Sequence, residues 1–256
     1  EAGMEYGKRV LQRGAEGLDV TELQIRLAGF AGGEPDGDFG PGTERQVMAF
    51  QRDFMKMPKP TGIVARATFS AIDRLADKYP FDFKKLKCPC GTCGGFGRGK
   101  FKGQYRGGTA HDEKSYLYEY PGMHRMLLWA VRGVYHYLSE HKLTISSGYR
   151  CSQNNAQHGR ASTNHHGKAI DLDIALERGE CNLDDQAKCN RARERIVATG
   201  NAQIGWAQKN RKALEPSDIA PTWVHYDVRC YERKYLGDKM FCATLKGLDN
   251  RKPIKI

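Results

Sequence analysis

Apolar residues recur every three or four positions in three segments near the start of the chain. The segments span residues 18–27, 42–54 and 65–76, and each one places its apolar side chains on one face of a helix. Between the first two, the stretch "GEPDGDFGPGT" carries the glycine and proline residues that a tight, ordered loop needs. The pattern predicts a compact bundle of three helices.

Polar residues indicate where the first two of these helices begin. Asp19 is followed three residues later by Glu22, which is the spacing of a capping box. Thr43 stands just before the second apolar run. We therefore expect Asp19 and Thr43 to cap the two helices.

From residue 121 the pattern changes to a mixture of helix and strand. Residues 122–141 keep the helical spacing for about five turns, and residues 184–199 form a second predicted helix. Short apolar runs predict three strands: "LTISSGYR" (143–150), "KAIDLDI" (168–174) and "TWVHYDVR" (222–229). This part of the chain is predicted to be an α+β domain.

Two of the predicted strands carry an apolar row on one face and an acidic or histidine row on the other. Asp171 and Asp173 share one face of the second strand, and His225 and Asp227 share one face of the third. If the strands are neighbours with these faces on the same side, the carboxylates converge and repel one another unless a cation lies between them. Nitrogen and oxygen ligands suit zinc. The alternation therefore predicts a zinc site.

The charge of the chain favours an anionic partner. The formal net charge is +11, which suits nucleic acid, anionic lipid or an anionic cell-wall polymer. The lysine and arginine residues are scattered rather than gathered on a reading helix, so we expect no nucleic-acid role. No apolar run approaches the roughly 18–20 residues of a membrane span, so none is expected.

The eight cysteines favour disulfide bonds and an oxidising compartment. Two pairs are close enough in sequence to close small loops: Cys181 with Cys189, and Cys230 with Cys242. The stretch "CPCGTC" offers an alternative, a structural zinc held by three cysteines and one distant ligand. Disulfides are favoured because only Cys90 and Cys93 have the C-x-x-C spacing of zinc sites, while Cys88 stands outside it.

The first part of the chain also carries a set of family motifs. These are LQ-x-x-L beginning at Leu23, "DGDFG" followed by Thr43, the pair Phe50-Gln51, and "TGIVARATFSAI". Together they resemble the three-helix peptidoglycan-binding domain of many cell-wall hydrolases. The resemblance implies a wall-anchoring module whose binding groove lies near three residues: Asp36, Phe39 and Gly40.

Three motifs in the second part, in order, are "SGYR" (147–150), "GKAIDLDI" (167–174) and "WVHYDVR" (223–229). They resemble the M15-type zinc peptidases, which include D-alanyl-D-alanine carboxypeptidases and phage L-alanyl-D-glutamate endopeptidases. The resemblance implies the small antiparallel sheet with helices that is shared with the hedgehog signalling domain. It also implies a zinc ion held by Asp171, His225 and a preceding histidine, with Arg150 steadying a substrate carboxylate or the developing oxyanion.

The chain departs from the family pattern at the first metal ligand. The spacing S-x-H-x-x-G, counted back from Gly167, places Asn164 where the histidine is expected. We predict that His165 is the ligand through a loop one residue shorter, with His166 as the alternative.

A second departure concerns the general base. Many family members carry an acid or a histidine two or three residues before the last ligand, where this chain has Trp223 and Thr222. The remaining candidates are Asp173, Asp218 and Asp227, and either Asp173 or Asp227 could instead orient a metal ligand.

These observations predict a zinc-dependent peptidase that hydrolyses the peptide stems or cross-links of bacterial peptidoglycan, as a carboxypeptidase or an endopeptidase. Residues 1–79 are expected to bind the wall, residues 80–120 to form a glycine- and cysteine-rich linker, and residues 121–256 to form the peptidase domain. We expect a monomer that acts in the cell envelope, either periplasmic or secreted, or delivered to the wall as a phage lysin. The alternative is a noncatalytic wall-binding protein with a degenerate peptidase domain.

Overall fold

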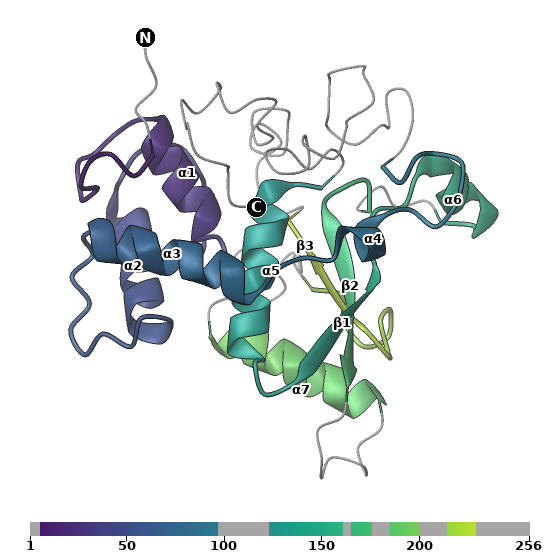
Figure 1. Ribbon diagram of the computed structural model, residues 1–256. Helices are drawn as coiled ribbons and strands as arrows, with labels where there is room; N and C mark the ends of the chain where they lie inside the picture. The colour runs from purple at the N-terminus through teal and green to yellow at the C-terminus, as the bar shows by residue number, and fades with distance from the viewer. Residues whose placement is uncertain (1–5, 97–122, 161–164, 176–184, 200–213, 229–256) are drawn as a thin grey trace.

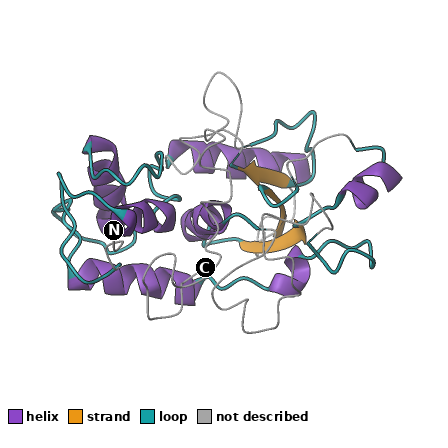
Figure 2. Ribbon diagram, turned by 90° about the horizontal axis from the view of Figure 1, so that it is seen from above, coloured by secondary structure: helices purple, strands orange, loops and turns teal. Residues whose placement is uncertain are grey.

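The computed structural model describes residues 6–96, 123–160, 165–175, 185–199 and 214–228. A helical bundle lies at one end of the molecule and a small sheet at the other, as Figures 1 and 2 show from two directions. This arrangement confirms the predicted fold class, an all-α region followed by an α+β domain. No helix among the described residues is long and apolar enough to cross a membrane.

The bundle consists of the three helices that the apolar spacing predicts: α1 (Leu18–Arg26), α2 (Pro41–Asp53) and α3 (Arg66–Lys78). Their apolar faces meet in a buried core. Phe30 and Phe50 pack edge to face there, with ring centroids 5.1 Å apart. The burial of these faces is what holds three short helices together, because helices of this length are marginal alone.

The predicted helix caps are wrong. Gly17 and Gly40 occupy the N-cap positions of α1 and α2, and neither makes a side-chain capping bond. Asp19 lies inside the first turn of α1 and accepts a hydrogen bond from Arg9 Nε at 2.8 Å. Thr43 lies inside α2, where its hydroxyl accepts a bond from Gln24 Nε2 at 2.9 Å. Both side chains therefore serve tertiary contacts.

Gln24 gives the LQ-x-x-L motif of the bundle a physical role. This buried amide donates to Asp36 Oδ1 at 2.8 Å and to the carbonyl oxygen of Asp38 at 3.1 Å. Its own oxygen accepts a bond from the Gly37 amide at 2.8 Å. Every polar atom of a buried amide needs a partner. These bonds therefore hold residues 36–38 of the loop between α1 and α2 against Gln24.

The α+β part is built around α5 (Arg125–Tyr137), which lies between the bundle and the sheet (Figure 1). It falls inside the predicted range 122–141 and is shorter than that range. The sheet has the order β1-β2-β3, and both pairings are antiparallel. The remaining elements are α4 (Phe83–Leu86), β1 (Lys142–Ser147), α6 (Ser152–Gln157), β2 (Ala169–Ala175), α7 (Asp185–Ala198) and β3 (Val224–Asp227).

A buried ion pair joins the bundle to the α+β part. Glu22 of α1 accepts hydrogen bonds from Arg125 of α5 at 2.5 and 2.8 Å, and from Arg26 at 2.7 Å. The side chains of Glu22 and Arg125 are fully buried. The carboxylate compensates for the arginine charges, and it fixes α1 against α5.

We expect Glu22→Gln to lower the free energy of unfolding by about 3–5 kcal/mol, because the arginine charges stay buried without their carboxylate. Burial alone would raise the pKa of Glu22, but the charges of Arg125 and Arg26 outweigh it and lower that pKa. The stabilisation is therefore present above the ordinary glutamate pKa and is lost as the pH falls through the lowered value. Urea unfolding at several pH values, followed by circular dichroism, measures both effects.

Glu44→Gln is the matched control, because Glu44 pairs with Arg13 at the surface. Glu44 Oε2 lies 3.4 Å from Arg13 Nη1, and the side chain of Glu44 is 33% exposed and that of Arg13 58% exposed. An exposed pair of this kind is worth about 0–1 kcal/mol. Equal losses in the two variants would contradict the role of the buried pair.

Candidate metal centre and active site

The pairing of β2 with β3 brings the two polar rows together. Asp171 lies directly opposite His225 in the antiparallel register, so both side chains emerge on the same face of the sheet. Arg193 of α7 donates a hydrogen bond to the carbonyl oxygen of Trp223 at 2.8 Å and so holds the chain that leads into β3. The predicted convergence of these rows is confirmed.

His165 reaches the same place from the loop before β2. Gly167 has a φ of 93°, a left-handed conformation that glycine adopts without strain, and it turns the chain from the histidine into the strand. The Nδ1 atom of His165 lies 2.7 Å from the carbonyl oxygen of Gly148. Since a carbonyl only accepts, Nδ1 carries the proton and Nε2 presents its lone pair.

One atom from each of three residues, His165, Asp171 and His225, lies within 4.8 Å of the others. Asp171 Oδ1 is 2.8 Å from His225 Nδ1 and 3.3 Å from His165 Nε2. Around a tetrahedral zinc with bonds of about 2.0–2.1 Å, neighbouring ligand atoms lie roughly 3.3 Å apart. The three atoms thus have nearly the spacing that a common zinc ion requires.

An unsatisfied atom supports the same conclusion. His165 Nε2 is buried and makes no hydrogen bond within the described part of the chain. A buried polar nitrogen without a partner is costly, and a metal ion would satisfy it. The donor set, two imidazoles and one carboxylate, is of the kind that binds catalytic zinc. These residues therefore fit the ion.

Asp227 holds His225 from the side away from Asp171. Its Oδ2 lies 2.7 Å from His225 Nε2, and its side chain is fully buried. Burial alone would lower the pKa of His225, but hydrogen bonds to Asp171 and Asp227 raise it to about 9. Burial would raise the pKa of Asp171, but the nearby His165 and His225 hold it well below its usual value. Asp171 and His225 therefore stabilise each other's charged forms.

Arg150 lies beside the cluster, where the strand β1 has ended. It donates a hydrogen bond from Nη2 to Asp171 Oδ2 at 2.8 Å, and its backbone amide bonds the carbonyl oxygen of His165 at 2.9 Å. The arginine therefore fixes the second oxygen of Asp171 and leaves Oδ1 directed at the two histidines.

The cluster opens into a cleft of about 660 Å³. Arg150 and Asp173 line this cleft, and so do Arg160 and Trp223, which add a second cation and an apolar wall. Asp173 is exposed. The cleft is thus open to a substrate and carries both signs of charge.

The cleft also contains a carboxylate that the sequence analysis missed. Glu215 lines the cleft, and its Oε2 lies 3.8 Å from His225 Nδ1. It is placed there because the preceding Leu214 forms a β-bridge with Tyr226. No motif signals this contact, since Glu215 stands ten positions before His225 in sequence. Asp218, by contrast, is exposed at the surface.

Other predicted site residues lie elsewhere. The ring of His166 packs 5.9 Å from that of Tyr149, and His166 is not among the three clustered ligands. In the bundle, Phe39 is fully buried in the core, whereas Asp36 is exposed in the loop and Gly40 precedes α2. Phe39 supports the loop from inside, and wall binding by this loop stays a prediction.

Two families match different parts of the chain. Residues 16–72 match the model of a putative peptidoglycan binding domain, and residues 102–204 match that of peptidase M15. Both resemblances drawn from the motifs are confirmed. The second match ends before β3, so it does not include His225.

One curated relative is the zinc D-Ala-D-Ala carboxypeptidase of Streptomyces albus G. It is 28% identical over 189 residues, which span 70% of this chain and 66% of the relative. Among solved structures, the SleB N-terminal domain is 38% identical and matches with a TM-score of 0.25, covering 27% of this chain and 94% of its own.

Proposed function

We propose that this chain, which combines a peptidase M15 segment with a putative peptidoglycan-binding segment, is a zinc-dependent peptidase of bacterial peptidoglycan. It would hydrolyse the peptide stems or cross-links of the wall. The observation that carries the proposal is the convergence of His165, Asp171 and His225 at the floor of an open cleft.

These three residues would hold the zinc ion through His165 Nε2, Asp171 Oδ1 and His225 Nδ1. Three protein ligands leave a coordination position open, as in catalytic rather than structural zinc sites. When bound, the ion supplies Lewis acidity, which lowers the pKa of a water molecule and polarises the scissile carbonyl.

The partners of the ligands would fix which nitrogen of each histidine faces the ion. The Gly148 carbonyl holds the proton of His165 on Nδ1, and Asp227 accepts the proton of His225 on Nε2. Such outer partners orient the rings and raise their basicity. Because Asp227 is fully buried behind His225, it suits this orienting role rather than that of a base.

Glu215 is our candidate for the general base. It would accept a proton from the attacking water and pass it to the leaving amine. Its carboxylate is partly exposed in the cleft and lies 3.8 Å from His225 Nδ1, the atom that would bind the ion. Asp173, the candidate from sequence, lines the same cleft. Arg150 would stabilise negative charge on the substrate or the intermediate.

The helical bundle would keep the peptidase at its polymeric substrate. Binding to the wall raises the local concentration of stem peptides without any further contact in the cleft. The net charge of +11 suits an anionic envelope. We expect a monomer acting at the cell wall, as a periplasmic or secreted enzyme or as a phage lysin.

Digestion of purified peptidoglycan by the full chain tests the proposal. We expect the zinc-loaded protein to release stem peptides or to split cross-links, and mass spectrometry of the products identifies the bond. Treatment with a chelator should stop the reaction, and zinc should restore it. A protein that binds sacculi and zinc but releases no peptide would instead be the noncatalytic binder.

A further inference from the structure

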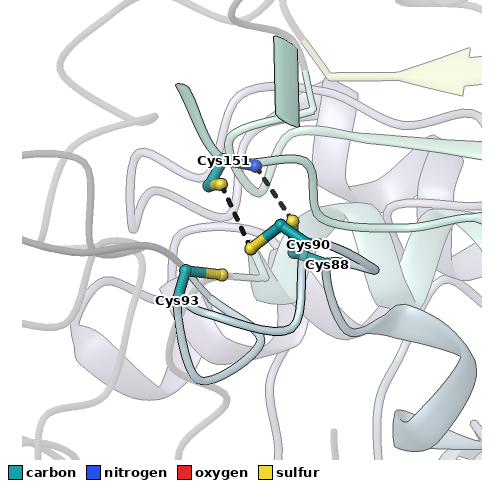
Figure 3. A group of neighbouring side chains, drawn as sticks. All are labelled: Cys88, Cys90, Cys93 and Cys151. Atoms are coloured by element: carbon teal, nitrogen blue, oxygen red, sulfur yellow. Dashed lines mark hydrogen bonds between the residues drawn. The ribbon is translucent and has the colours of Figure 1, made fainter. Parts of the chain in front are cut away.

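A second group of potential metal ligands lies outside the histidine and aspartate cluster. It consists of Cys88, Cys90 and Cys93 from the segment after α4, and of Cys151 just before α6 (Figure 3). We propose that these four cysteines form a closed structural site for zinc or a similarly thiophilic divalent ion. This proposal does not depend on the proposed peptidase function.

The sulfur spacing fits a metal better than disulfides. All four sulfur atoms lie within 4.8 Å of one another. Cys151 Sγ is 3.6 Å from Cys90 Sγ, whereas a disulfide needs about 2.05 Å. In a tetrahedral site with Zn–S bonds of about 2.3 Å, neighbouring sulfurs lie roughly 3.8 Å apart. The observed separation is close to this expected sulfur–sulfur distance.

Backbone amides point at three of the four sulfurs. The amide of Cys151 donates to Cys88 Sγ, that of Thr92 to Cys90 Sγ, and that of Asn154 to Cys151 Sγ, each at 3.4 Å. N–H donors stabilise sulfur that carries negative charge, which is the form that binds metal. Each of these donors would therefore favour the thiolate of the sulfur that it faces.

The backbone holds the two halves of the site together. The amide of Cys88 bonds the carbonyl oxygen of Gly95 at 2.8 Å and closes the loop that carries three of the cysteines. The amide of Tyr149 bonds the carbonyl oxygen of Leu86 at 2.8 Å. A β-carbon at Gly148 would lie 2.6 Å from Leu86 Cα, so only glycine permits this approach.

Four cysteines around one ion leave no open coordination position, which marks the site as structural. Cys88, Cys93 and Cys151 are buried, and Cys90 is partly exposed. The site is also adjacent to the cleft, because Pro89 lines the cleft wall. Cys151 directly follows Arg150. An ion bound here would therefore hold the cleft wall at Pro89 and the backbone next to Arg150 in place.

Metal analysis of the full chain, purified without added chelator, tests the site. We expect about two zinc ions per chain in the wild type, one in each site. The double variant Cys90→Ser/Cys93→Ser should hold about one, and so should His225→Ala, which removes the other ion. Cys189→Ser is the matched control, because Cys189 is buried in α7 outside the cluster and its loss should leave the zinc content unchanged.

Thiol titration of the wild type gives a test that does not require a variant to fold. Under native conditions without reductant, adding a strong chelator should make four more thiols per chain reactive. Disulfides among the four cysteines would instead leave them unreactive until reductant is added, with a mass lower by two hydrogens per bond. That result would overturn the proposal, and so would four free thiols in a protein holding only one zinc.

Cobalt substitution separates the two sites by their ligands. Thiolate ligands give cobalt(II) an intense near-ultraviolet charge-transfer absorption, and imidazole and carboxylate ligands do not. We expect this absorption in the wild type and in His225→Ala, and its loss in Cys90→Ser/Cys93→Ser. The same absorption in wild type and double variant would contradict the assignment.

Discussion

We expect His225→Ala to lose the catalytic zinc and its peptidoglycan hydrolysis to fall to the level of the chelated protein. In the proposed site His225 provides one of three ligand atoms, and the remaining two, from His165 and Asp171, would be too few to retain the ion. Loss of an outer partner such as Asp227 typically costs about 10–100-fold in metal affinity. Removal of the ligand itself should cost more. Zinc content and product release, measured on the same preparations, check this result.

His158→Ala is the control for His225→Ala. His158 lines the same cleft, but its Nδ1 bonds the carbonyl oxygen of Asn154 at 2.8 Å and it lies outside the ligand cluster. Its loss should leave the zinc content unchanged. Retention of catalytic zinc and full activity in His225→Ala would exclude the metal centre described above.

Glu215→Gln should lower kcat by about 10²–10⁴-fold while the zinc content stays at the wild-type level. The amide keeps the size of the side chain but cannot accept the proton of the attacking water. Because Glu215 is not one of the three clustered ligands, metal binding should survive. Steady-state hydrolysis of a stem peptide, together with metal analysis, separates loss of the base from loss of the ion.

Asp173→Asn is the matched comparison, since Asp173 is the carboxylate that the sequence proposed for this role and it lines the same cleft. A loss of kcat confined to Glu215→Gln, with removal of the acidic limb of the pH–rate profile, would assign the base to Glu215. The reverse ranking would assign it to Asp173 instead.

The sequence is least informative where side chains have several possible partners. Asp19 and Thr43 have the residue types and positions of helix caps, yet they bond Arg9 and Gln24 instead. Local patterns describe the bonds available within one turn of helix, and a charged or amide partner from a distant segment can take the same oxygen. The helices themselves are still predicted correctly, because they depend on the burial of a whole apolar face and not on a single side-chain bond.

The longer helices and the three strands follow from the sequence, since strand alternation and helical spacing are set by backbone geometry, whereas the short helices α4 and α6 have no such pattern. In β2 and β3 the alternation correctly placed Asp171 and His225 on polar faces. It could not show that the two residues lie opposite each other, because register depends on how the strands are packed. The choice between His165 and His166 likewise depended on a loop whose turn at Gly167 directs His165 into the cluster.

The sequence by itself determined the order of the two parts, the longer helices, the strands and the chemistry of the proposed metal ligands, because these depend on residue type and local period. Only the tertiary structure decided which groups meet. It brought Glu215 to His225 through the bridge formed by Leu214, and Cys151 to the three cysteines after α4. Those contacts join segments far apart in the chain, and no local period records them.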